Sequence, residues 1–96
     1  MSLHISDSVI WHETAEGISL YHTESGEFRT LNGSAAKIWV LVESDQEREP
    51  VKDKLALMFA GGNAAMGARI RSEVDTFIDS MVGSGLLAEG EPAAAA

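Results

Sequence analysis

The sequence predicts an α+β domain in which a three-stranded antiparallel sheet is followed by three helices. Two observations favour this class: β-forming residues and glycine-containing turns alternate before Asn32, and apolar residues recur at helical spacing after it. With 96 residues, of which 45% are apolar, the chain has material for one small core and one domain. We expect that domain at residues 1–88 and a mobile tail at 89–96, where EGEPAAAA has nothing to bury.

The expected strands cover residues 8–13, 18–23 and 27–31. The runs SVIWHE, ISLYHT and EFRTL are rich in residues that favour strands, and short turns separate them. Gly26 stands where a left-handed residue completes a type I turn with a G1 bulge, and Gly17 ends the first turn in the same way. Both hairpins predict antiparallel pairing in chain order.

The expected helices cover residues 33–43, 50–59 and 65–82. Asn32 is a good N-cap, and Pro50 suits the first helical turn because its missing N–H would have no partner there. The segment AGGN at 60–63 separates the second helix from the third, and Gly83 is the expected end of the third. Leu86 and Leu87 are expected to fold back onto the core. Two helices joined by a short break, with the sheet as a wing, give a winged helix-turn-helix arrangement.

The charge balance argues against nucleic acid as a partner. The net charge is −8, from 15 acids and 7 bases, and such a surface repels a phosphate backbone. The third expected helix carries only Arg69 and Arg71 against three acids. The chain has no cysteine, no signal-like N-terminus and no stretch of roughly 18 apolar residues. We therefore expect a cytoplasmic protein that binds neither nucleic acid nor membrane.

No pattern in the sequence indicates catalysis. His4, His12 and His22 are not accompanied by carboxylates at a recognisable metal-ligand spacing. The serines lack a neighbouring base motif, and the glycine pair at 61–62 lacks the lysine of a phosphate loop. We therefore expect no enzyme activity, no metal and no cofactor.

Binding is the remaining class of function. In a meander, the strand at 27–31 is an edge whose free backbone groups invite another strand, and the long third helix can lie beside it. An extended peptide would add there as a fourth strand. Two alternatives stay open: self-association through the same edge, and a winged-helix DNA-binding protein, which the charge disfavours.

Two segments resemble a known family. The run YHTESGEFRTLNGSAAKIWVLVE resembles the signature of the pyrroloquinoline quinone biosynthesis protein D family, in which a strand ending in Leu-Asn leads into a helix. The later SEVDTFIDSMVGSGLL is similar to the closing pattern of that family, and the likeness covers about residues 8–88. The resemblance implies a non-catalytic winged helix that holds the leader of a ribosomally made precursor peptide while an enzyme modifies it. The segment GISLYHTESGEFRTLN, together with Trp39, also resembles stand-alone leader-binding proteins of lasso-peptide clusters, whose partner is a leader protease.

The resemblance also implies a binding site. Carried over by position, the leader would pair with the third strand at Glu27, Phe28, Arg29, Thr30 and Leu31. It would lie against the third helix at Arg69, Ile70, Glu73, Val74 and Phe77. Leu31 would anchor the core and Asn32 would cap the helix. The partners implied are a precursor leader and either a radical enzyme or a leader protease, with the protein a monomer or homodimer. The stretch VESDQEREP departs from the family pattern, so we expect an irregular link between the first two helices.

Overall fold

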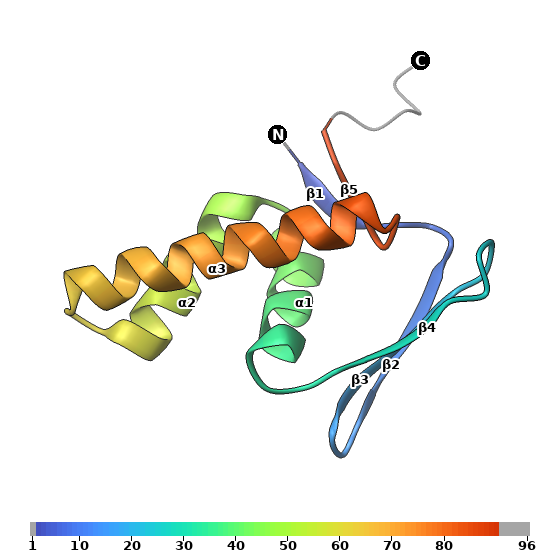
Figure 1. Ribbon diagram of the computed structural model, residues 1–96, viewed down its shortest axis with the longest axis horizontal. Helices are drawn as coiled ribbons and strands as arrows, with labels where there is room; N and C mark the ends of the chain where they lie inside the picture. Colours follow the sequence, from blue (N-terminus) through green and yellow to red (C-terminus); the bar gives the residue numbers. More distant parts are fainter. Residues whose placement is uncertain (1, 91–96) are drawn as a thin grey trace.

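A computed structural model describes residues 2–90 of the chain (Figure 1). The described elements are, in chain order, β1 (Leu3–Ile5), β2 (Val9–Thr14), β3 (Gly17–His22), β4 (Phe28–Leu31), α1 (Gly33–Asp45), α2 (Arg48–Ala60), α3 (Ala64–Gly83) and β5 (Leu87–Glu89). Strands β2, β3 and β4 form an antiparallel sheet in that order, as the sequence predicts. The three predicted helices are confirmed, with ends that shift by up to two residues. The α+β class and the wing-like sheet are thus confirmed.

A second pair of strands was not predicted. β1 and β5 pair antiparallel, with Leu3 opposite Glu89 and Ile5 opposite Leu87. Each strand has three residues, too few for an alternating pattern to be recognised. The pair joins the two ends of the described chain beside α3 (Figure 1).

The prediction of a mobile tail at 89–96 is wrong at its beginning. Glu89 is the last residue of β5, and both of its carboxylate oxygens accept hydrogen bonds from Arg48, at 2.8 and 2.7 Å. The backbone N–H of Gly90 donates to the carbonyl of Ser2 at 2.8 Å. Strand pairing and this ion pair hold residues that have no apolar surface to bury. Residues 91–96 lie outside the described part of the chain, and the prediction for them stays untested.

One core joins the sheet to the helices. Ile18 and Leu20 of β3 are 1% exposed and lie on the face of the sheet that the helices cover. Trp39 of α1 is fully buried, and the ring of Trp11 meets it edge-on, with centroids 6.1 Å apart. The other members of the core are Leu3, Leu31, Ile38, Val42, Val51, Leu55, Val74, Ile78, Met81, Leu86 and Leu87. The prediction that Leu86 and Leu87 return to the core is therefore confirmed.

The helix ends differ in part from expectation. Asn32 is the N-cap of α1 by position, but its side chain makes no capping hydrogen bond. Asn63 is the effective cap, since its side-chain oxygen accepts from the N–H of Met66 at 2.9 Å. The link between α1 and α2 has two residues, and it turns at Gln46, whose φ of 57° is left-handed. Pro50 lies in the first turn of α2, as predicted.

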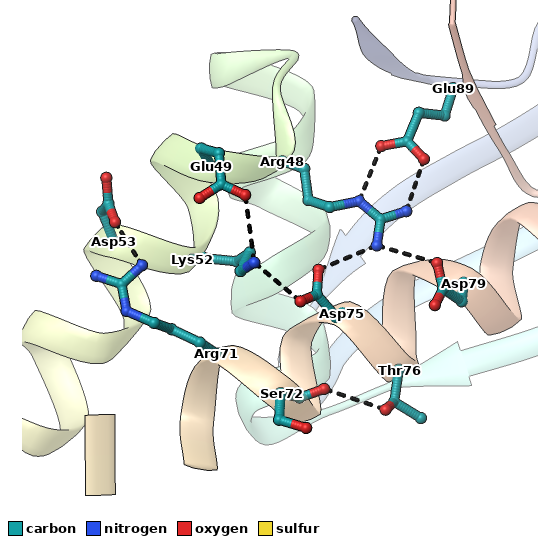
Figure 2. A network of polar contacts seen from close by, with 10 residues as sticks. All are labelled: Arg48, Glu49, Lys52, Asp53, Arg71, Ser72, Asp75, Thr76, Asp79 and Glu89. Carbon is teal, nitrogen blue, oxygen red and sulfur yellow. Dashed lines mark hydrogen bonds and ion pairs between the residues drawn. The ribbon is translucent and has the colours of Figure 1, made fainter. Parts of the chain in front are cut away.

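A polar network fixes α3 against α2 and β5 (Figure 2). The Nη1 atom of Arg48 lies 3.0 Å from carboxylate oxygens of both Asp75 and Asp79, and Nη2 lies 2.7 Å from Glu89. Lys52 reaches Asp75 at 2.8 Å. The bond from Lys52, with that from Arg48, lowers the pKa of Asp75. One guanidinium of α2 thus links α3 to β5.

Candidate functional site

The backbone of β4 has one free edge. Among the described residues, β4 pairs only with β3, so its other edge carries no strand. The N–H of His22 donates to the carbonyl of Glu27 at 2.9 Å, on the β4 side of β3. The N–H of Thr23 donates to Ser8 on the β2 side. Since consecutive residues of a strand direct their backbone groups to opposite sides, these two bonds fix which residues of β3 face β4.

The orientation of each β4 residue follows from that register. The pairs Leu20 with Arg29 and Ile18 with Leu31 continue the series that begins at His22 and Glu27. The backbone groups of Arg29 and Leu31 therefore bond to β3. Those of Phe28 and Thr30, the alternate residues, point to the free edge. The edge thus offers two N–H donors and two C=O acceptors, two residues apart.

Side chains of β4 alternate in the same way. Arg29 and Leu31 stand opposite the buried Leu20 and Ile18, so they share the helix-side face. Leu31 is 5% exposed and is the core anchor that the resemblance implied. Phe28 and Thr30 lie on the other face and are exposed.

α3 forms the second wall. Ile70, Glu73 and Val74 line a hollow of about 340 Å³, together with Ser34, Ile38, Leu55 and Phe59 from α1 and α2. Val74 is 2% exposed, so it forms the floor of the hollow. Ile70 is half-buried, so part of its side chain is open to solvent. The structure therefore brings together three of the five α3 residues that the resemblance indicated.

The other predicted residues do not line this hollow. Arg29 is paired with the carboxylate of Glu27, and its Nη1 lies 3.7 Å from the sulfur of Met81, which links β4 to the second half of α3. Phe77 is half-buried and packs on the core. Arg69 has a side chain that is 79% exposed and lies 3.6 Å from Glu73. Such an exposed pair stabilises little, so both side chains are available to a ligand.

Sequence reasoning missed the contributions of α1 and α2. The sequence predicts no binding role for Ile38, Leu55, Phe59 or Ser34. These residues come together only where the start of α1 and the end of α2 meet α3. Their spacing in the chain carries no signal for a shared hollow.

The fold is that of a small winged α+β module with a free strand edge beside a helix. The family model for coenzyme PQQ synthesis protein D (PqqD) matches residues 17–87, and the chain belongs to the PqqD family. The structure titled "TbiB1 in Complex with the TbiA(beta) Leader Peptide" is similar, with a TM-score of 0.78 and 19% identity. The likeness covers 93% of this chain and 99% of that chain, and at this identity it shows a shared fold. No curated protein matches the chain.

The described residues also bear on two other kinds of function. Within residues 2–90, no helix combines the length and the apolar character needed to cross a bilayer. The same residues contain no cluster of three or more histidine or acidic side chains arranged to hold a metal ion.

Proposed function

We propose that this protein binds the leader of a ribosomally made precursor peptide and presents the peptide to a modifying enzyme or leader protease. The observation that carries the proposal is the free edge of β4, with the outward backbone groups of Phe28 and Thr30, in a sheet whose Arg29 reaches Met81 of α3. Membership of the PqqD family supports it. So does the likeness to TbiB1, which is described in complex with a leader peptide.

In this proposal the leader adds to β4 as a fourth strand. Backbone hydrogen bonds to Phe28 and Thr30 supply affinity that does not depend on sequence. Because paired residues of neighbouring strands point to the same face, leader residues opposite Phe28 and Thr30 point away from the helices. The leader residue between them, opposite Arg29, points toward α3. Specificity therefore rests on alternate leader residues.

The leader side chains that point toward α3 would be apolar, and polar leader residues would lie next to them in the sequence. Ile70, Val74 and Phe77 present the apolar surface, and the hollow of about 340 Å³ is large enough to take a side chain. Glu73 and Arg69 stand at the rim with opposite charges. A disordered leader loses conformational entropy on binding, and a groove whose walls are already fixed reduces the remaining cost.

The protein itself is proposed to act without catalysis, so the chemistry belongs to the partner enzyme. The partner would be a radical enzyme or a leader protease, as the resemblance implied. Purified protein incubated with its precursor should leave the mass of the peptide unchanged. A new peptide mass that forms in the absence of any partner would contradict this part of the proposal.

The test is a titration of isotope-labelled protein with a synthetic leader of a precursor peptide identified among the neighbouring genes. We expect micromolar or tighter binding, about −8 kcal/mol, with amide shifts at Phe28, Thr30 and along α3. Ile70→Asp places a charge in the hollow and should lower affinity at least about tenfold. Ser72→Asp is the matched control, because it adds the same charge to an exposed position of α3 outside the hollow. Shifts that cluster instead at residues 9–13 would show that the other edge of the sheet binds the leader.

A further inference from the structure

The face of the sheet that points away from the helices has an unusual composition. Cross-strand pairing aligns Ile10, Tyr21 and Phe28 in one row across β2, β3 and β4. The next row is His12, Ser19 and Thr30. Neither row contains an Asp, Glu, Lys or Arg, although 23% of the chain is charged. We call these two rows the outer face.

The charged residues of these strands lie on the opposite side. Glu13 pairs with the buried Ile18, and Arg29 pairs with the buried Leu20, so both point to the helix-side face. An antiparallel sheet with one face in water usually carries polar residues on that face, whereas one row of the outer face consists of Ile10, Tyr21 and Phe28. Depletion of charge around exposed aromatic residues is the composition of protein–protein interfaces.

The apolar row is well exposed. The exposed fractions are 62% for Ile10, 41% for Tyr21 and 65% for Phe28. With roughly 200 Å² for a whole side chain of this size, the row offers about 350 Å². A stable interface buries about 800 Å² on each partner. Two copies that met through this row alone would bury less than that in total, and each copy carries a net charge of −8. A second copy is therefore a poor occupant.

The row ends at the edge where the leader is proposed to add. A leader residue opposite Phe28 would stand beside it on the same face and lengthen the row by one strand. We infer that the outer face is the docking surface for the enzyme that acts on the leader-bound peptide, an inference that rests on the proposed function. The enzyme surface that fits is apolar, with uncharged hydrogen-bonding groups around it to meet the hydroxyls of Ser19 and Thr30.

The test uses Ile10→Lys, which lies two strands away from the leader edge. Leu57→Lys is the matched control, because Leu57 is also apolar and is 72% exposed, but belongs to α2. Leader affinity is measured by calorimetry without enzyme. Affinity for the purified enzyme encoded with the precursor is measured separately, without leader, so that the two results are independent.

We expect Ile10→Lys to bind the leader as the wild type does and to bind the enzyme at least about tenfold more weakly, because it inserts an unpaired charge into an apolar contact. Leu57→Lys should change neither affinity. Since the outer face carries no charge, wild-type enzyme binding should change only about twofold between low and physiological salt.

Three results would overturn the inference. The first is an Ile10→Lys variant that binds the enzyme as tightly as the wild type does. The second is a Leu57→Lys variant that loses as much enzyme affinity as Ile10→Lys does. The third is light scattering that shows a dimer for the wild type and a monomer for Ile10→Lys. The third would assign the outer face to a second copy. A wild-type protein that fails to bind the leader would contradict the proposed function instead. The comparison of enzyme affinities would still test the outer face, because it is made without leader.

Discussion

Proline at Thr30 and proline at Arg29 should have opposite consequences, although the two residues are neighbours in β4. The N–H of Thr30 points to the free edge, whereas that of Arg29 belongs to the ladder with β3. Proline removes the N–H and fixes φ near −65°. Thr30→Pro should therefore weaken leader binding, and Arg29→Pro should mainly weaken the fold.

The expected sizes follow from the hydrogen bonds involved. Thr30→Pro deletes one leader–protein bond, worth about 1 kcal/mol net, and leaves a leader carbonyl without its donor, so a loss of about 2 kcal/mol is reasonable. That corresponds to a roughly 30-fold weaker affinity. Its effect on folding should be small, because an edge strand accepts proline where the N–H faces solvent.

Arg29→Pro deletes a bond inside the sheet. It leaves the carbonyl of the buried Leu20 without a partner and removes the side-chain pair with Glu27. An unsatisfied buried group costs about 1–3 kcal/mol, which lowers the melting temperature by roughly 4–8 °C per kcal/mol in a domain of this size.

Calorimetry measures leader affinity, and tryptophan fluorescence follows unfolding, since Trp39 is fully buried and touches Trp11. The reasoning is refuted if Arg29→Pro abolishes binding with its stability intact while Thr30→Pro binds normally. That result would mean that the register of β4 is shifted by one residue, which exchanges the two orientations.

Three further predictions concern the scaffold and its chemistry. Gly17→Ala should destabilise the fold by roughly 3 kcal/mol, because φ is 152° and the new Cβ would stand 1.9 Å from the carbonyl oxygen of Leu31; Gly62→Ala, where the Cβ meets nothing within 4 Å, is the control, and equal melting temperatures would contradict this. The pKa of Asp75 is lowered below 3.8 by the hydrogen bond from Lys52, so its contribution to stability is complete above that value and is lost as the pH falls below it. The melting-temperature gap between wild type and Asp75→Asn should thus shrink between about pH 7 and about pH 3, and a constant gap would count against the network. Treatment with a chelator should leave both the melting curve and leader affinity unchanged, and a loss of either would show that a metal is needed.

Local features of the sequence determined most of the fold. The change of period at Asn32 marks the passage from sheet to helix, and Pro50 and Gly83 mark helix ends, because each acts through its own backbone geometry. The edge position of β4 also follows from chain order, since a meander closed by short turns leaves its last strand unpaired on one side. These features depend on residues a few positions apart.

Only the tertiary structure decided the rest. Pairing of β1 with β5 joins segments more than eighty residues apart, and three residues on each side give no local signal. The outward direction of Phe28 and Thr30 depends on a register in which a slip of one residue would reverse every side chain. The hollow on α3 gathers residues from three helices, so its existence depends on how the helices pack. Propensity and pattern act over single elements, whereas a register or a hollow is set by contacts between elements that the chain brings together only when it folds.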